Sequence, residues 1–326
     1  MMESIPLGPP AQAMVSLTQG LSQINNYPDP SYRKLRAALA QYHQIPPDWI
    51  MPGNGAAELL TWAGRELAQY QTTYLIVPAF RDYWRALQGF GAKVTTYPLQ
   101  WDKDSCSLRL NIVNPQSSGL IVNNPHNPTG KLLARETLLP LLEQFALVIL
   151  DEAFMDFLTP DEEQSLIPLV FNYPNLVIVR SLTKFYSLPG LRLGYAIAHR
   201  DRLQQWQNWR DPWSVNILAA IVGEKVIKDQ EFQEKTWQWL VRARKSLFEG
   251  LSKIKGLEPI KSSVNFLLVK TQVPSSQLQR ELLEHDQILI RDCLSFPELG
   301  DRYFRVAVRT EPENQRLLAA LAQILS

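Results

Sequence analysis

The sequence predicts an α/β protein with a mostly parallel central sheet sandwiched by helices, followed by a smaller α+β C-terminal domain. Short apolar or β-branched runs alternate with longer segments in which apolar residues recur every three or four positions. The run at 147–150 is apolar throughout, which is typical of a strand that is buried on both faces of a parallel sheet. With 326 residues, the chain has room for one large and one smaller domain.

The first two thirds of the chain carry the strand and helix alternation. The segment 32–42 predicts a helix because Leu35, Ala38, Leu39 and Tyr42 recur with helical spacing, and Asp29 or Ser31 can cap it. Three more helices are expected at 56–69, 81–89 and 137–144. Strands are expected at 73–77, 93–97, 119–122, 147–150 and 176–180. This order favours a parallel sheet covered by helices on both faces.

A second domain is predicted to begin near the Asp-Pro-Trp segment at 211–213. A long helical region follows at 215–251, then strands at 264–269, 288–291 and 303–308 and a closing helix at 314–325. The predicted organisation is an N-terminal segment at 1–25, a large domain at 26–210 and a small domain at 211–326.

The composition argues against several classes of protein. Thirty-three basic residues balance 32 acidic ones, and no run of like charge predicts nucleic-acid binding. The two cysteines, Cys106 and Cys293, are expected to be reduced thiols of a cytoplasmic protein, and no spacing of residues predicts a metal site. No signal peptide or membrane span is expected, because the N-terminus has no basic and apolar leader and the apolar runs are short.

The segment from Ser181 to Tyr195 carries the most chemical information. It places a serine three residues before Lys184 and an arginine, Arg192, eight residues after it. A lysine amine forms a Schiff base with an aldehyde, whereas a hydroxyl and a guanidinium suit a phosphate. Together these groups predict a site for pyridoxal 5'-phosphate, which carries both an aldehyde and a phosphate.

Polar residues also follow two of the other predicted strands. Asp151 comes directly after the strand at 147–150, where it is either a helix cap or the partner of a cation such as a protonated pyridine nitrogen. Asn127 lies in the turn at 123–130, which is either a plain Asn/Pro/Gly turn or the source of an amide for the cofactor's ring oxygen. His126 in the same turn is interpreted as a turn residue. Functional loops of parallel sheets gather at the carboxyl ends of the strands, where these residues lie.

Two further segments fit the same cofactor. Gly55, Ala56 and Ala57 precede a helix, where small residues allow backbone amides to approach a phosphate, although a simple helix cap has the same pattern. Phe80 is either a core aromatic or a ring that stacks on the cofactor.

Taken in order along nearly the whole chain, these segments resemble fold type I pyridoxal-phosphate enzymes of the aminotransferase class I/II superfamily. The resemblance implies a Schiff base at Lys184, Asp151 on the pyridine nitrogen and Asn127 on the ring oxygen. It places Ser181, Arg192 and the amides of residues 55–57 on the phosphate and Phe80 over the ring. It also implies a homodimer in which Tyr27 reaches the cofactor phosphate of the neighbouring subunit.

Two branches of the superfamily compete, histidinol-phosphate aminotransferase and threonine-phosphate decarboxylase, and the decarboxylase is more similar. The segments at 212–216, 236–240, 288–293 and 303–309 resemble it, and Phe154 stands where many aminotransferases have a tyrosine. This resemblance implies decarboxylation of L-threonine O-3-phosphate to (R)-1-aminopropan-2-yl phosphate in cobalamin biosynthesis. Arg291, Arg305 and Arg309 are then expected to bind the two anionic groups of the substrate, without a fixed assignment.

Three alternatives remain open from the sequence. The first is an aminotransferase that acts on histidinol phosphate and requires a 2-oxo acid. The others are a pyridoxal-phosphate-binding regulatory domain without turnover and an inactive enzyme. The decarboxylase pattern usually begins further upstream, with a His-Gly-Gly-Asn segment that this sequence lacks, and Ala56 and Ala57 replace polar side chains of related chains.

Overall fold

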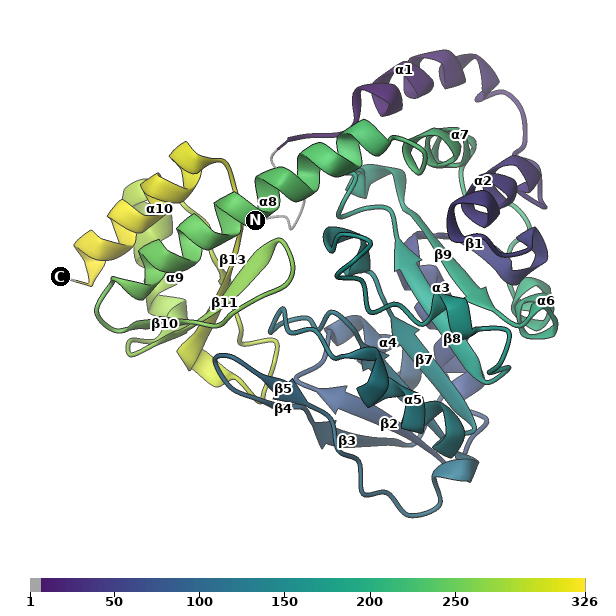
Figure 1. Ribbon diagram of the computed structural model, residues 1–326, viewed down its shortest axis with the longest axis horizontal. Coiled ribbons are helices and arrows are strands. Elements are labelled where there is room, and N and C mark those ends of the chain that lie inside the picture. Colours follow the sequence, from purple (N-terminus) through teal and green to yellow (C-terminus); the bar gives the residue numbers. More distant parts are fainter. Residues whose placement is uncertain (1–6, 326) are drawn as a thin grey trace.

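A seven-stranded sheet forms the core of the larger part of the protein in a computed structural model that describes residues 7–325 (Figure 1). The strand order is β1-β9-β8-β7-β6-β2-β3. Neighbouring strands from β8 to β3 are parallel, whereas β9 is antiparallel to β8 and β1 is antiparallel to β9. The strands are β1 Ile50–Asn54, β2 Thr72–Val77, β3 Val94–Pro98, β6 Ser118–Asn123, β7 Leu147–Asp151, β8 Leu176–Ser181 and β9 Leu193–Ala198.

Helices cover both faces of this sheet, as the apolar strands require. Along β7, Leu147 and Ile149 belong to a core shared with α3, α4 and α6, whereas Val148 and Leu150 belong to a core shared with α5. Successive residues of a strand point to opposite faces, so an apolar run of this kind is buried only between two helical layers. The helices around the sheet are α2 Arg33–His43, α3 Gly55–Leu67, α4 Arg81–Gln88, α5 Arg135–Gln144 and α6 Arg200–Trp209.

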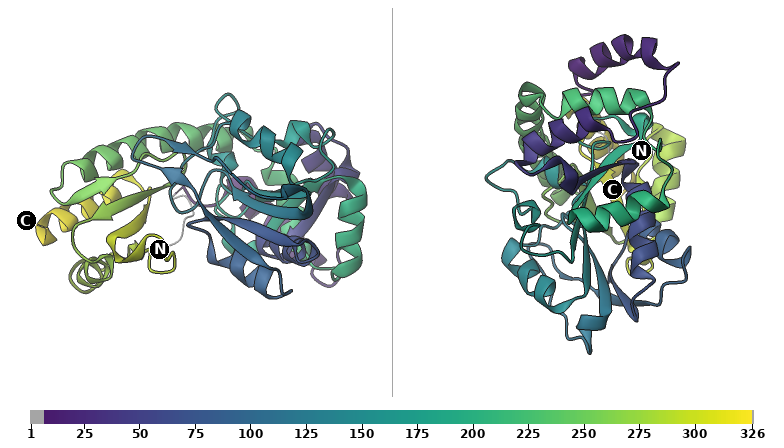
Figure 2. Two further views of the ribbon diagram at one scale, coloured as in Figure 1. Left: turned by 90° about the horizontal axis from the view of Figure 1, so that it is seen from below. Right: turned by 90° about the vertical axis from the view of Figure 1, so that its right-hand side faces the viewer.

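The C-terminal part of the chain builds a smaller antiparallel sheet in the order β10-β11-β13-β12. Figure 2 shows this sheet and its helices at one end of the molecule and the large sheet at the other. The elements are β10 Leu257–Pro259, β11 Phe266–Thr271, β12 Arg291–Asp292, β13 Tyr303–Ala307, α8 Gln230–Ser252, α9 Ser275–Asp286 and α10 Glu311–Ile324. A short hairpin of β4 Gln100–Trp101 and β5 Cys106–Ser107 completes the strands of the described chain. The predicted fold class is therefore what the structure shows.

The helical region expected at 215–251 is two helices, α7 Ile217–Val226 and α8. The chain is interrupted because the Asp229 carboxylate accepts a hydrogen bond from the Phe232 amide and caps a new helix. Helix α7 packs against α1 Ala11–Gly20 and α2 beside the large sheet, whereas α8 contacts β10 and β11 of the small sheet (Figure 1). Helices α7 and α8 connect the part of the molecule around the large sheet to the part around the small sheet, and the predicted domain limits stay a prediction. Residues 1–6 lie outside the described chain.

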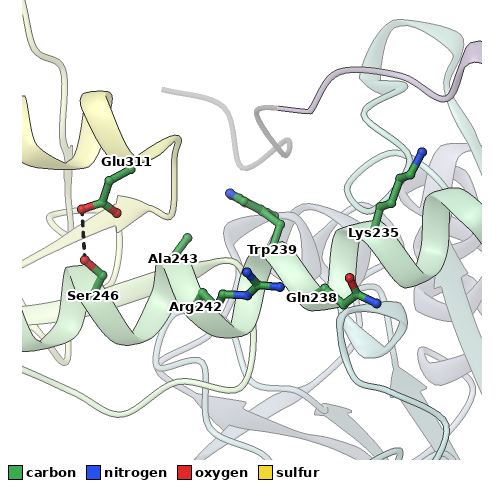
Figure 3. Close-up of a pocket in the computed structure, with 7 residues that line it drawn as sticks. All are labelled: Lys235, Gln238, Trp239, Arg242, Ala243, Ser246 and Glu311. Carbon is green, nitrogen blue, oxygen red and sulfur yellow. Dashed lines mark hydrogen bonds between the residues drawn. The ribbon is translucent and has the colours of Figure 1, made fainter.

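The first residue of helix α10, Glu311, is hydrogen-bonded to helix α8. The Ser246 hydroxyl donates a hydrogen bond to the Glu311 carboxylate over 3.3 Å (Figure 3). A capping box between Thr310 and Glu313 satisfies backbone amides at the same helix start. The surface hollow beside this contact is lined by residues such as Lys235, Trp239 and Arg242, and none of the predicted site residues lines it (Figure 3).

Within residues 7–325, no helix combines the length and the apolar character that crossing a membrane requires.

The packing of α3 against α4 depends on the missing side chain of Gly64. A Cβ atom at this position would lie 2.4 Å from the backbone oxygen of Ala86 in α4. We therefore expect Gly64→Ala to force the helices apart and to lower the free energy of unfolding by about 1–3 kcal/mol, measured by urea titration. Gly190→Ala is the control, because a Cβ there meets nothing within 4 Å, and an unchanged stability of Gly64→Ala would contradict the expected clash.

Candidate active site

A cavity lies at the carboxyl ends of the parallel strands β6, β7 and β8. Asn123 ends β6, Asp151 ends β7 directly opposite it in the register, and Ser181 ends β8. The cavity also takes residues from the start of α3 and from the loops that follow β2 and β8. It is lined by Ala56, Ala57, Leu60, Phe80, Tyr83, Asn123, Asn127, Asp151, Ala153, Phe154, Ser181, Thr183, Lys184 and Arg192. The structure thus brings together eight of the predicted site residues.

Lys184 lies three residues beyond the end of β8, with its side chain half-buried. Burial lowers the pKa of its amine below the ordinary value, and the nearby Arg192 guanidinium lowers this pKa further. The Asp151 carboxylate acts in the opposite direction but does not cancel the effect of burial. A lysine with a lowered pKa supplies its neutral amine for imine exchange and proton transfer closer to neutral pH.

Asp151 is buried beside Lys184. Its Oδ1 accepts a hydrogen bond from the Ala153 backbone amide over 2.9 Å, and its Oδ2 accepts one from the Tyr83 hydroxyl over 2.6 Å. Burial raises the pKa of this carboxyl, while both hydrogen bonds and the Lys184 charge oppose that rise. The site therefore places a carboxylate with little water around it where a cationic ring nitrogen would find a partner.

Asn127 is held by one hydrogen bond at its backbone and one at its side chain. Its backbone amide donates to the Asn123 side chain over 2.6 Å, which orients the turn after β6. Its Oδ1 accepts a hydrogen bond from the Arg305 guanidinium, which reaches in from β13 of the small sheet. Arg305 is buried and lies over the Phe266 ring at 4.7 Å, and burial lowers its pKa to about 10. Because Arg305 remains charged at neutral pH, it places a fixed cation beside the cavity.

The other end of the cavity is shaped to receive a phosphate. Gly55 has a φ of +73°, and a Cβ on it would lie 2.5 Å from the Arg192 guanidinium. A Cβ on Gly194 would lie 2.7 Å from the Ala56 backbone nitrogen, so two glycines let α3, β9 and Arg192 approach one another. The Ser181 and Thr183 hydroxyls are 2.7 Å apart at the same cavity. Amides at a helix N-terminus, hydroxyls and a guanidinium together form a donor set that suits a phosphate.

Five predicted residues do not line the cavity. Gly55 and Arg305 lie against its lining residues Arg192 and Asn127, and the other three are Tyr27, Arg291 and Arg309. Tyr27 is 79% exposed, and its ring lies 4.9 Å from that of Trp213. Arg291 is exposed on β12 and donates to Ser295, and Arg309 pairs with Glu313 over 2.8 Å. The roles expected of these three residues stay predictions.

Tyr83, Asn123 and Thr183 belong to the cavity but were not predicted as site residues. Thr183 lies within the segment that predicted Lys184, and Asn123 opens the turn that predicted Asn127. For Tyr83 the signal is its position three residues after Phe80, because residues three apart lie on the same face of a helix. The two rings are in contact edge to face, with centroids 5.8 Å apart.

The chain belongs to the aminotransferase class I and II family, whose sequence profile matches residues 9–321. The threonine-phosphate decarboxylase of Salmonella typhimurium is 37% identical over 98% of this chain and 89% of the relative. The histidinol-phosphate aminotransferase of Symbiobacterium thermophilum is 32% identical over 98% of this chain and 88% of the relative. The crystal structure of L-threonine-O-3-phosphate decarboxylase from Porphyromonas gingivalis matches with a TM-score of 0.89 at 25% identity, over 99% and 98% of the two chains.

These findings confirm the predicted family, the fold type I architecture and pyridoxal 5'-phosphate as its cofactor. They also confirm the predicted similarity to threonine-phosphate decarboxylases. The cavity fits this cofactor, because an amine, a buried carboxylate and a phosphate cradle made possible by Gly55 and Gly194 share one space.

Proposed function

We propose that the protein is a pyridoxal-phosphate-dependent carboxy-lyase that converts L-threonine O-3-phosphate to (R)-1-aminopropan-2-yl phosphate and CO2. The observation that carries the choice of reaction is the 37% identity to the Salmonella decarboxylase over nearly the full length of both chains. The cavity supports it with the groups that amino acid chemistry of this kind requires. The role in cobalamin biosynthesis and the cytoplasmic location are part of this proposal.

One set of residues would hold the cofactor and another would hold the substrate. Lys184 would bind the cofactor's aldehyde, Asp151 its pyridine nitrogen and Asn127 its ring oxygen. Ser181, Arg192 and the amides at the start of α3 would bind its phosphate, and Phe80 would cover its ring. When bound, pyridoxal phosphate supplies an electron sink that weakens one bond at the substrate's Cα.

The arginines would select which bond at Cα is weakened. Arg305 and Arg291 are direct partners in the register of β12 and β13, and side chains of such pairs project from the same face of a sheet. Two cations on one face suit a substrate with a carboxylate and a phosphate. Holding these two anions fixes the orientation of the carboxylate, which leaves as CO2 with its bonding electrons remaining on Cα. The Lys184 amine is placed to return a proton to Cα.

The proposal includes a homodimer in which Tyr27 reaches the cofactor phosphate of the partner subunit. The high exposure of Tyr27 supports this arrangement, as do the exposed apolar residues of the same stretch of chain, Met14, Leu21 and Ile24. Sedimentation velocity of the purified protein measures the association state.

The decarboxylase reaction is tested by a product assay. We expect protein loaded with pyridoxal phosphate to form aminopropanol phosphate from L-threonine O-3-phosphate over many turnovers, without any 2-oxo acid, as measured by mass spectrometry. Histidinol phosphate with 2-oxoglutarate serves as the second reaction. Glutamate formed there, with no aminopropanol phosphate in the first reaction, would overturn the decarboxylase in favour of the aminotransferase, which the 32% identical relative represents.

A further inference from the structure

The Tyr83 hydroxyl donates a hydrogen bond to the Asp151 carboxylate. The distance from this hydroxyl to Oδ2 is 2.6 Å, and the Ala153 backbone amide donates to Oδ1. Both Tyr83 and Asp151 are buried, so this bond forms away from water. A hydrogen bond to a carboxylate in such surroundings is stronger than one between neutral groups.

Charged side chains of both signs act on Asp151. The charged groups that act on it are Lys184, which favours its ionised form, and Asp82 at the start of α4, which disfavours that form. A carboxyl that is removed from water tends to keep its proton. A neutral Asp151 would be a poor partner for a cationic ring nitrogen, so the donors on its oxygens decide how well it serves that role.

The fold holds the Tyr83 hydroxyl in place without help from a ligand. Tyr83 is 2% exposed, and its ring packs edge to face against Phe80. Its helix, α4, packs closely against α3 at Gly64, where an added Cβ atom would lie 2.4 Å from the Ala86 backbone oxygen. The start of α3 also contributes Ala56 and Ala57 to the phosphate end of the cavity, so the packed helices α3 and α4 both supply residues that line it.

We propose that Tyr83 is a positioning residue of the cofactor site, whose hydroxyl keeps the Asp151 carboxylate ionised and oriented toward the cofactor's pyridine nitrogen. This inference rests on the proposed pyridoxal-phosphate function and adds to it a residue that acts through Asp151. The hydroxyl donates a hydrogen bond and keeps its proton, so no group is transferred.

The test is Tyr83→Phe, which removes the hydroxyl and keeps the ring. We expect the dissociation constant of pyridoxal phosphate to rise about tenfold, measured by titrating apoprotein with the cofactor. We also expect the pH at which the absorption band of the bound cofactor changes to rise by about one unit. The absorption band reports the protonation of the nitrogen that joins Lys184 to the cofactor. A pyridine nitrogen that holds its proton less firmly withdraws less charge from this nitrogen, whose pKa therefore rises.

A double-mutant cycle separates this role from a loss of packing. In an Asp151→Asn background, Tyr83→Phe should change the dissociation constant by no more than about twofold and the pH of the absorption change by no more than about 0.3 unit, because the carboxylate on which it acts is gone. Tyr195→Phe is the matched control, since it removes another buried hydroxyl, one that pairs with His43 over 2.7 Å, and it should leave the absorption titration unchanged.

Two results would overturn the inference while leaving the proposed function intact. One is wild-type cofactor binding and an unchanged absorption titration in Tyr83→Phe, and the other is an equal effect of Tyr83→Phe in the Asp151→Asn background. Wild-type protein that bound no pyridoxal phosphate would overturn the proposed function itself, and this inference with it.

Discussion

Lys184→Ala is expected to remove the decarboxylase activity, lowering kcat by at least about 10²–10⁴-fold through the loss of proton transfer alone. Among the described residues that line the cavity, Lys184 is the one that carries an amine. The loss of its attachment to the cofactor adds to the loss of proton transfer. The measurement is single-turnover formation of aminopropanol phosphate by protein saturated with pyridoxal phosphate, so that weaker cofactor binding does not imitate a catalytic defect.

Lys131→Ala provides the matched control for Lys184→Ala. Lys131 is buried, and burial lowers its pKa as it does that of Lys184. Its amine donates to the Lys103 carbonyl over 2.7 Å, and Lys131 does not line the cavity. We expect this variant to keep the wild-type kcat. A Lys184→Ala protein that kept more than about a tenth of the wild-type kcat would show that another group performs the proton transfer.

The site residues that could be predicted from the sequence are those carried by strand ends and by the loops directly after them. Asp151 and Ser181 follow runs of apolar residues, and the carboxyl ends of parallel strands meet at one edge of the sheet. Lys184 follows Ser181 within the same loop. Their proximity therefore requires only that β7 and β8 be parallel neighbours, as they are in the structure and as a mostly parallel sheet allows.

Residues whose role depends on the packing of distant helices could not be predicted in the same way. Tyr83 meets Asp151 across 68 positions of the chain, and Gly64 allows its helix, α4, to approach α3 closely. Strand β1 was also missed, because Pro52 and Gly53 interrupt the pattern of a strand. Its place at the edge of the sheet makes a proline tolerable there.

Arg180→Leu is expected to lower the free energy of unfolding by about 3–5 kcal/mol, because it leaves buried carboxylates without their cation. Arg180 lies on β8 directly before Ser181, and its side chain is 2% exposed. Its guanidinium contacts Glu152 at 2.9 Å, Asp156 at 2.6 Å and Glu163 at 2.5 Å. Since Glu152 directly follows Asp151, this cluster joins the ends of the two strands that carry the site.

The loss of stability in Arg180→Leu should depend on pH in a direction that identifies its cause. In the wild-type protein burial raises the pKa of Asp156 to about 6 despite the guanidinium, so its contribution to stability falls as the pH rises from about 4 to about 6. Without Arg180, the pKa values of Asp156 and Glu152 rise further in the folded state. At about pH 5 these carboxyls take up protons and are tolerated, whereas at about pH 8 they are ionised without a partner, so the stability loss grows with pH.

Urea unfolding of wild-type and Arg180→Leu protein at the two pH values measures this difference. Lys235→Met is the control, because it breaks the exposed pair with Glu231 on α8 and should leave stability unchanged at both pH values. A loss of equal size at both pH values would show that Arg180 stabilises the protein by packing alone. A loss that grows with pH would show that its charge stabilises the protein by pairing with Glu152, Asp156 and Glu163.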